Sequence, residues 1–321
     1  MVNRSLTVAG LFAGVGGIEL GFQRAGFVPV LANEIDKYAS VTYRANHAHE
    51  LAEGDIGTLP SDALPDDLTV LAGGFPCQPF SVAGYRKGFE DDRGNVFRDI
   101  VRLMQDRQPE VVFLENVKNL KGHDNGNTFR VINESLEASG YSVAAKVLNA
   151  SEYGNIPQNR ERIYIIGFKN ADANARFQWP EPMPLTTKLS DLIDFNRKVD
   201  SKYYYGAKQP FWSMLQSDIT KTNTMYQWRR QYVRENKSGV CPTLTANMGM
   251  GGHNVPLIKT RYGIRKLTPR ECFNLMGFDP DFVLPEELAS SQLYKQAGNS
   301  VVVPVVQRIA TEINVALSTA K

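Results

Sequence analysis

The first 170 residues alternate short apolar runs with amphipathic segments, and this alternation constrains the fold more than any other feature. The apolar runs have the length of strands, and the segments between them have a helical pattern. Such alternation predicts a mostly parallel sheet with helices on both faces. The expected strands are 6–12, 28–32, 69–71, 111–114, 144–149 and 163–168, and the expected helices are 17–25, 37–45, 97–105 and 128–139.

The character of the sequence changes at the proline-rich stretch WPEPMP, which begins at Trp179. The residues beyond it are aromatic, polar and basic, without a clear helical period. Helical patterning resumes where Thr268 can cap a helix that has Pro269 at its first position, and again over 301–317. We therefore predict a large α/β domain over 1–185, a smaller irregular domain over 186–284, and a segment 285–321 that returns to the large domain.

The overall composition is that of a soluble globular protein, with 42% hydrophobic and 22% charged residues. No apolar run approaches the ~20 residues needed to span a bilayer, and the N-terminus lacks the apolar core of a signal peptide. Cys77, Cys241 and Cys272 are odd in number and widely spaced, so neither a disulfide framework nor a metal site is indicated. These features predict a cytoplasmic protein that is not in a membrane.

Positive charge is concentrated in one part of the chain. Residues 219–270 contain ten lysines and arginines against one acidic residue, Glu235, although the whole chain has a net charge of only +2. Scattered surface lysines usually form just a solvated face. So large an excess in one segment of an otherwise acidic chain favours a polyanionic partner.

The loops after the first strands have the features of a nucleoside-binding site. Gly14, Gly16 and Gly17 lie between a strand and a helix, where glycines let a backbone approach a ligand. Glu34 ends the second strand, where a carboxylate can accept hydrogen bonds from ribose hydroxyls, and Asp55 can bind an adenine amino group. The pattern fits NAD or S-adenosylmethionine. A tight turn without a ligand and two solvated acids are the alternative.

A cysteine between two prolines follows the predicted strand 69–71. Pro76 and Pro79 restrict the backbone on both sides of Cys77 in GGFPCQPFS, which gives a stiff loop. Glu115 ends the strand in VVFLENV at the same predicted edge of the sheet. A thiol beside a carboxyl group suggests covalent catalysis with acid assistance. The alternatives are a buried structural cysteine and a solvated strand end.

The ordered motifs FAGVGG, PCQPFS, ENV, QNRER and AGNSVVVPV resemble those of DNA (cytosine-5)-methyltransferases. The resemblance covers residues 6–180 and 262–321, about three quarters of the chain. It implies the Rossmann-like α/β fold of S-adenosylmethionine-dependent methyltransferases, with a second, smaller target-recognition domain. Five motifs in one order are far more specific than any single motif.

The resemblance also implies a mechanism in which a cytosine leaves the duplex to be methylated. Cys77 would add to carbon 6 of the base and so activate carbon 5. Glu115 would contact N3 and the amino group, Arg160 would hold the O2 carbonyl oxygen, and Arg162 would support the site. The stiff proline-flanked loop would then hold the sulfur still against the face of the base.

The implied cofactor is S-adenosylmethionine. By resemblance its site is formed mainly by the loops after the first strands, completed by two residues from the far end of the chain. The residues concerned are Phe12, Gly14, Val15, Gly17, Glu34, Ile35, Asp55, Ile56, Pro76, Asn299 and Ser300.

The implied partner is double-stranded DNA with a short target sequence. Residues 186–263 occupy the place of the family's recognition region, and TLTANMGMGG resembles its signature. Arginines there can contact phosphates or read guanine. The residues predicted to contact DNA are Ser81, Gln158, Arg229, Arg230, Arg234 and Thr243. We expect a monomer of the compact prokaryotic or phage type, which is often paired with a restriction endonuclease for the same site.

Three other functions compete with this prediction. A cytosine-5 methyltransferase acting on transfer RNA belongs to a related branch, but the large basic segment favours DNA. A homologue that binds DNA without catalysis would not need the complete set of catalytic residues that this chain has. A nicotinamide oxidoreductase would explain the glycine loop alone, but neither PCQ nor ENV.

Overall fold

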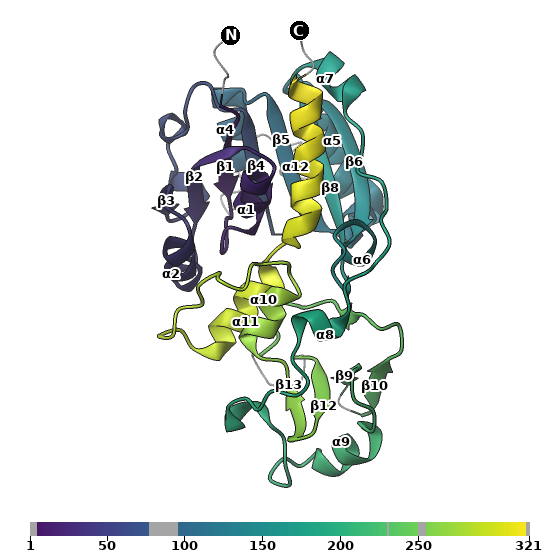
Figure 1. Ribbon diagram of the computed structural model, residues 1–321. Helices are drawn as coiled ribbons and strands as arrows, with labels where there is room; N and C mark the ends of the chain where they lie inside the picture. Colours follow the sequence, from purple (N-terminus) through teal and green to yellow (C-terminus); the bar gives the residue numbers. More distant parts are fainter. Residues whose placement is uncertain (1–4, 77–95, 230, 250–254, 319–321) are drawn as a thin grey trace. The chain divides into compact units, whose positions relative to one another are not determined.

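The computed structural model describes residues 5–76, 96–229, 231–249 and 255–318 of the chain. These residues form two compact units (Figure 1). Unit 1 comprises Met1–Leu148, Glu161–Glu181 and Val305–Lys321, and unit 2 comprises Asn149–Arg160 and Pro182–Pro304. Residues 285–304, which we expected to belong with the large domain, group with unit 2 in this division.

Unit 1 is built on a seven-stranded sheet with the order β3-β2-β1-β4-β5-β8-β6. Neighbouring strands from β3 to β5 pair in parallel, and β8 pairs antiparallel with β5. The predicted mostly parallel sheet is thereby confirmed. The strands are β1 (Thr7–Leu11), β2 (Val28–Glu34), β3 (Glu50–Glu53), β4 (Val70–Gly74), β5 (Val111–Val117), β6 (Ser142–Asn149) and β8 (Glu161–Phe168).

The helices of unit 1 lie where the amphipathic segments predict them, except for one short helix at Ala171–Arg176 that was not predicted. They are α1 (Gly17–Arg24), α2 (Lys37–Asn46), α4 (Val96–Arg107), α5 (Asn127–Ala138), α7 (Ala171–Arg176) and most of α12 (Val303–Ser318), with short 3₁₀ turns η1 (Ile56–Thr58), η2 (Ser61–Ala63), η3 (Lys118–Lys121) and η4 (His123–Gly126). Figure 1 shows α12, in yellow, beside α1. A Cβ on Gly21 of α1 would lie 2.7 Å from the side chain of Val306, so these two helices can pack this closely only because residue 21 is glycine.

The strand order reverses at β1, which has β2 on one side and β4 on the other. In open α/β sheets, ligands bind outside the carboxyl ends of the strands at such a reversal. The loop that begins at Phe12 follows β1, and Phe75 and Pro76 follow β4. The glycine loop and the approach to Cys77 therefore both begin at the position where this fold binds its ligands.

Residues 290–318 are long and apolar enough to pass a test for a membrane span by length and composition alone. The stretch comprises two helices, α11 (Ser290–Asn299) and α12. Ile309 and Ile313 of α12 are fully buried. The apolar character of α12 is therefore explained by its packing within unit 1.

A carboxyl group is buried where α1, α2 and β1 meet. Glu19 of α1 is fully buried, and its Oε1 lies 3.5 Å from the hydroxyl of Tyr43 on α2. A Cβ on Gly10 of β1 would lie 1.9 Å from this Oε1, so β1 leaves room for the carboxyl group only through that glycine. Burial, with the negative charge of Glu34 nearby as a minor cause, raises the pKa of Glu19 to about 8. The side chain is therefore neutral at pH 7.

This burial makes stability depend on pH in a defined direction. The folded state binds the Glu19 proton up to about pH 8, whereas the unfolded chain releases it near the ordinary pKa of 4.5. The contribution of Glu19 to stability should therefore fall as pH rises between these values, on the order of 1 kcal/mol per pH unit, and level off above pH 8. Glu19→Gln mimics the neutral acid and should remove this dependence. Urea unfolding of both proteins from pH 5 to 9 measures it, and parallel stability curves would contradict the assignment.

Unit 2 contains a four-stranded antiparallel sheet with the order β10-β9-β12-β13. Leu215, Ile219, Tyr226 and Leu257 form its core, and Trp228 stacks on Phe211. We expected an irregular domain; its strands are only four residues long, which is too short to give a clear alternating pattern. The elements are α6 (Ala150–Tyr153), β7 (Gln158–Asn159), α8 (Leu189–Leu192), η5 (Ser201–Tyr203), α9 (Trp212–Asp218), β9 (Met225–Trp228), β10 (Val233–Asn236), β11 (Cys241–Pro242), β12 (Leu257–Thr260), β13 (Gly263–Lys266), α10 (Pro269–Asn274) and α11.

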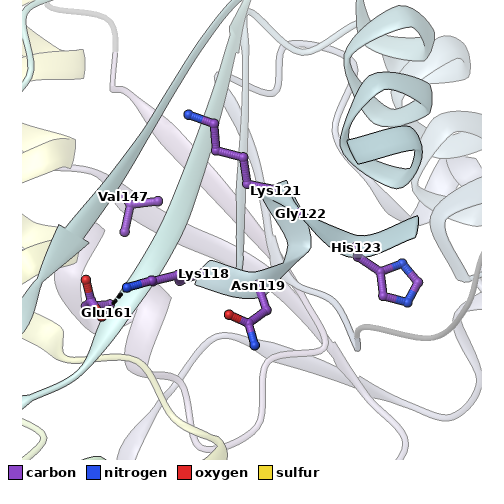
Figure 2. Close-up of a pocket in the computed structure, with 7 residues that line it drawn as sticks. All are labelled: Lys118, Asn119, Lys121, Gly122, His123, Val147 and Glu161. Atoms are coloured by element: carbon purple, nitrogen blue, oxygen red, sulfur yellow. Dashed lines mark hydrogen bonds and ion pairs between the residues drawn. The ribbon is translucent and has the colours of Figure 1, made fainter. Parts of the chain in front are cut away.

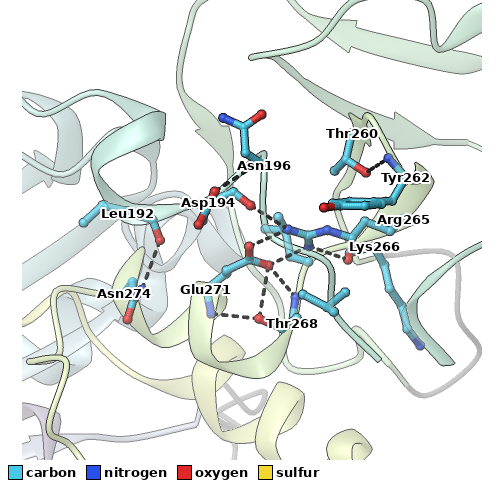
Figure 3. Close-up of polar contacts among 12 residues, drawn as sticks. Leu192, Asp194, Asn196, Thr260, Tyr262, Arg265, Lys266, Thr268, Glu271 and Asn274 are labelled. Carbon is cyan, nitrogen blue, oxygen red and sulfur yellow. Dashed lines mark hydrogen bonds and ion pairs between the residues drawn. The ribbon is translucent and has the colours of Figure 1, made fainter. Parts of the chain in front are cut away.

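A buried ion pair connects this sheet to α10 (Figure 3). Both terminal nitrogens of Arg265 on β13 donate to the carboxylate of Glu271, at 2.8 and 2.7 Å. The same carboxylate accepts from the backbone nitrogen of Thr268, which caps α10 as predicted and precedes Pro269. Arg265 is 0% exposed, so it is one residue of the basic segment that adds nothing to a basic surface.

Candidate active site

The loop after β1 is anchored by the carboxylate that ends β2. Glu34 is 7% exposed, and its two oxygens accept from the backbone nitrogens of Gly14, at 2.6 Å, and Asp36, at 2.7 Å. Phe12, directly after β1, has a φ of 53°, an uncommon backbone conformation for a residue with a side chain. Strained residues of this kind are concentrated at functional sites, which agrees with the predicted role of this loop.

Three further residues predicted to bind the cofactor lie after β2 and β3. Ile35 is 64% exposed although its side chain is apolar, so it offers a surface for a flat ring. Asp55 is exposed and its Oδ1 accepts from the nitrogen of Gly57, whereas Ile56 is buried. An exposed apolar side chain, a carboxylate and a glycine loop at one sheet edge fit a nucleoside.

Glu115 and Arg162 form an ion pair at the junction of β5 and β8. Nε of Arg162 lies 3.0 Å from Oε1 of Glu115, with side chains 15% and 11% exposed. The antiparallel register pairs Val117 with Arg162, so both residues lie at the carboxyl end of β5. A Cβ on Gly74, which pairs with Glu115 from β4, would lie 3.3 Å from its Oε2. The carboxylate thus faces the end of the strand that leads to Cys77.

Asn116 is a residue of this site that the sequence analysis missed. It is buried, and its side-chain nitrogen donates to the carbonyl oxygen of Phe75 at 2.9 Å. Asn116 thereby fixes the backbone two residues before Cys77, which itself lies outside the described residues. Its position inside the ENV motif could have marked Asn116 as a functional residue. Only the fold shows that it binds the carbonyl of Phe75.

Arg160 lies in unit 2, and its guanidinium group donates to three backbone carbonyls. Nη1 donates to Leu244 at 2.7 Å, and Nη2 donates to Gly298 at 3.1 Å and to Ser300 at 2.6 Å. The residue is 3% exposed. These contacts join the recognition signature to the turn after α11. Of the two arginines in QNRER, Arg162 is the one that forms an ion pair with Glu115.

Gln158 is also used inside unit 2. Its side-chain nitrogen donates to the carbonyl of Leu275 at 2.7 Å, its side-chain oxygen accepts from the nitrogen of Leu244, and the residue is fully buried. Thr243 is exposed and donates to the carbonyl of Asn159. The burial of Gln158 gives no support to a contact with DNA, which stays a prediction for both residues.

The remaining predicted residues are spread over both units. Arg229 and Arg234 are exposed at the β9–β10 hairpin, and Asn299 and Ser300 end α11 in unit 2. Ser81 and Arg230 lie outside the described residues, like Cys77. Cys241 and Cys272 are fully buried, which raises the pKa of both thiols, so neither has the character of a nucleophile. The described residues contain no cluster suited to a metal ion.

A pocket opens directly after β5, at the same edge of unit 1 (Figure 2). Lys118 in its wall is paired with Glu161 at 2.7 Å, and Lys121 and His123 add further basic groups. None of the predicted site residues lines it; the lining residues are Lys118, Asn119, Lys121, Gly122, His123, Val147 and Glu161. Its charge suits an anion more than an apolar ligand.

Residues 6–315 match the family described as C-5 cytosine-specific DNA methylase. The chain belongs to this family. The Type II methyltransferase M.Bsp6I of Bacillus sp. (strain RFL6) is 59% identical over 96% of this chain and 98% of that protein. The Type II methyltransferase M.HhaI of Haemophilus parahaemolyticus is 40% identical over 96% of this chain and 94% of that protein.

Solved structures agree on the fold of this DNA cytosine-5 methyltransferase. The DNMT2 of Spodoptera frugiperda, as a mutant, has a TM-score of 0.74 and 19% identity over 97% of this chain and 100% of that chain. A putative DNA modification methyltransferase from an Escherichia coli prophage has a TM-score of 0.71 and 23% identity over 98% and 100%. The family resemblance and fold class are confirmed, and the nicotinamide oxidoreductase is set aside.

The placement of Arg160 predicts a large effect on stability. Arg160→Ala would remove the donor of three carbonyl groups, two of them in contacts that are buried on both sides, and should destabilise the methyltransferase by about 3 kcal/mol. Arg176→Ala is a matched control that should cost about 1 kcal/mol, because among the described residues its guanidinium donates to a single carbonyl, that of Ala316. Urea unfolding compares the two variants, and equal losses would show that the three carbonyls do not depend on Arg160.

Proposed function

We propose that this methyltransferase modifies carbon 5 of a flipped-out cytosine within a short double-stranded DNA sequence, through a covalent adduct with Cys77. The observation that carries the proposal is the Glu115–Arg162 pair, which lies at the end of β5 beside the strand that leads to Cys77. A carboxyl group and a guanidinium group held together in this way can bind the N3 and O2 side of one cytosine ring.

The chemistry follows from what cytosine lacks, because its carbon 5 is a poor nucleophile. The thiolate of Cys77 forms a bond to carbon 6, and the electron pair of the ring moves towards N3, where Glu115 supplies a proton. Carbon 5 can then take a methyl group. Loss of the carbon 5 proton and elimination of the thiolate restore the aromatic ring, and Glu115 recovers its proton from N3.

We assign the contact with the base oxygen to Arg162 and not to Arg160, contrary to the sequence-based expectation. Arg162 is within 3.0 Å of Glu115 and partly exposed, whereas Arg160 already donates to three carbonyls. In this proposal Arg160 is a positioning residue. It holds Leu244 of the recognition signature and the turn that contains Asn299 and Ser300.

S-adenosylmethionine would supply the methyl group. Glu34 and Ile35 after β2, Asp55 and Ile56 after β3, and the loop from Phe12 to Gly17 would hold it, with Pro76, Asn299 and Ser300 as further predicted contacts. The exposed apolar side chain of Ile35, and a carboxylate that already fixes the loop backbone at Gly14, fit its adenosine part.

We further propose a modification enzyme of a restriction–modification system that is monomeric and cytoplasmic, with a cognate endonuclease for the same site. The high identity to Type II methyltransferases over nearly the full length of both chains supports this assignment. The exposed arginines of the β9–β10 hairpin, with Arg230 between them, would contact DNA. Transfer RNA remains the competing substrate, and methylation assays on both nucleic acids decide between them.

The mechanism predicts different effects for two substitutions. Cys77→Ser should abolish methylation, and it should not form the denaturation-resistant adduct that the parent forms with DNA containing 5-fluorocytosine. Glu115→Gln keeps the shape of the side chain but loses the acid, so turnover should fall by about 10²–10⁴ while DNA and cofactor still bind. Exchange of the carbon 5 hydrogen with solvent should slow as well.

Two outcomes would overturn these roles. An adduct from Cys77→Ser as strong as that from the parent would place the nucleophile elsewhere. Normal methylation by Glu115→Gln would make Glu115 a structural partner of Arg162 only, and the acid would be another group. Folding of each variant is checked by urea unfolding, so that loss of activity is not mistaken for loss of structure.

The hairpin predicts a change in the salt dependence of DNA binding. Arg229→Ala and Arg234→Ala should each either lower the slope of log K against log salt by about one, if the residue contacts a phosphate, or relax the target at one base pair, if it reads a base. Lys169→Ala is the control, because Lys169 follows β8 beside the start of β5, whereas Glu115 lies near the carboxyl end of β5. Binding titrations at several salt concentrations measure the slope. Variants that bind and methylate DNA like the parent would show that Arg229 and Arg234 of the hairpin do not contact DNA.

A further inference from the structure

His47, which follows α2, contacts the loop from Phe12 to Gly17 but is not one of the residues predicted to bind the cofactor. We call this loop the cofactor loop. Its Nε2 lies 3.1 Å from the carbonyl oxygen of Val15, which is 32 residues earlier in the chain. A carbonyl only accepts hydrogen bonds, so Nε2 must carry the proton in this contact. His47 belongs to the sequence NHAHE and to none of the motifs that define the family resemblance.

The same imidazole occupies the space beside Gly16. This glycine has a φ of 85°, and a Cβ built on it would lie 2.0 Å from Nε2 of His47. Gly14, two residues earlier, has a φ of 58°. Both glycines adopt the left-handed conformation, which glycine tolerates because it has no Cβ. The same lack of a Cβ leaves the backbone free to adopt other conformations, so contacts with other residues must hold this one.

The restraint comes from two neighbouring points of the loop. Glu34 accepts from the nitrogen of Gly14 at 2.6 Å, and His47 donates to the carbonyl of Val15. One anchor comes from the end of β2 and the other from the end of α2. Together they fix the backbone nitrogen of Gly14 and the carbonyl group of Val15 before any ligand is bound.

His47 is itself held by a buried polar cluster. Its ring packs on that of Tyr43, with ring centroids 4.3 Å apart, and its backbone nitrogen donates to the carbonyl of Tyr43. The hydroxyl of Tyr43 lies between Oε1 of Glu19 and Nε2 of His49. Burial lowers the pKa of both histidines, that of His49 to about 4, so the imidazoles are neutral at pH 7.

We propose that His47 is a positioning residue for cofactor binding, which holds the Val15 carbonyl and the backbone of Gly16 in the conformation that receives S-adenosylmethionine. The proposal rests on the proposed function, because it takes S-adenosylmethionine as the ligand of this loop. His47 does not touch the cofactor. It lowers the cost of ordering the loop on binding.

Direct titration of the DNA-free protein with S-adenosylmethionine tests the proposal. His47→Leu should raise the cofactor Kd about 5- to 10-fold, as expected for loss of one hydrogen bond and the order it imposes. His47→Gln keeps a donor near the position of Nε2 and should stay within about 2-fold of the parent. In steady-state kinetics the KM for the cofactor should rise with His47→Leu, with kcat and the KM for DNA nearly unchanged.

His49→Leu is the matched control. His49 contacts Tyr43 and the ring of His47 in the same cluster, and the structure gives it no contact with the loop itself among the described residues. It should lower stability in urea unfolding about as much as His47→Leu while leaving the cofactor Kd unchanged. Equal Kd values for His49→Leu and His47→Leu, or full loss of affinity in His47→Gln, would reduce His47 to a structural residue and overturn the proposal.

A second pair of variants tests the contact with Gly16 independently. Gly16→Ala adds a Cβ that collides with Nε2 of His47, in addition to the strain of its positive φ. In the background of His47→Ala the collision is gone and only the strain remains, so the same substitution should raise Kd by a smaller factor. Equal factors in both backgrounds would contradict the contact. If the parent bound no S-adenosylmethionine at all, the proposed function would fail instead.

Discussion

In unit 2 the guanidinium group of Arg160 joins the recognition signature to the end of α11. Three carbonyls from distant parts of the chain, Leu244, Gly298 and Ser300, converge on its donors. No neutral side chain offers so many donors in a fixed plane. Gln158 adds the contacts with Leu244 and Leu275 from two residues earlier. A short motif thereby organises residues that are 84 to 140 positions away.

Unit 1 is organised in a different way, by backbone geometry more than by a single side chain. Parallel pairing brings the ends of β1, β2, β4 and β5 to one edge, and small residues at the ends of these strands leave space for larger groups. Gly10 makes room for Glu19, and Gly74 lies against Glu115. The strained φ of Phe12 begins the loop that these strands present. Glycines in β1 and β4 therefore leave space for two carboxyl groups that a larger residue would exclude.

The parts of this architecture that depend on local pattern could be predicted from the sequence. The strands of unit 1 were expected within a few residues because buried parallel strands are continuous apolar runs, and Thr268 with Pro269 signals a helix start locally. β3 was missed, because ELAE is short, lies at the edge of the sheet and has charged ends. The antiparallel sheet of unit 2 was missed for the same reason of length.

The partners of individual side chains could not be predicted, because they depend on contacts distant in sequence. Glu115 was predicted from its place at a strand end, but its ion pair with Arg162 follows only from the register of β8 on β5. Gln158 has the residue type of a DNA contact, yet Leu275, 117 residues away, uses its amide nitrogen. Asn116 and His47 both act on backbone carbonyls, and no sequence pattern shows which carbonyl a side chain will reach.

These backbone contacts follow one physical logic at both ends of the candidate site. The loop from Phe12 to Gly16 and the segment after β4 have irregular backbones, since they belong to no strand or helix. An irregular backbone leaves peptide groups without regular partners, and side chains with a single defined hydrogen-bonding role take them up. Glu34 accepts from Gly14, His47 donates to Val15, and Asn116 donates to Phe75. Glu34 and Asn116 lie in strands, and His47 directly follows α2. These side chains therefore fix the backbone of the loops to the regular elements of unit 1.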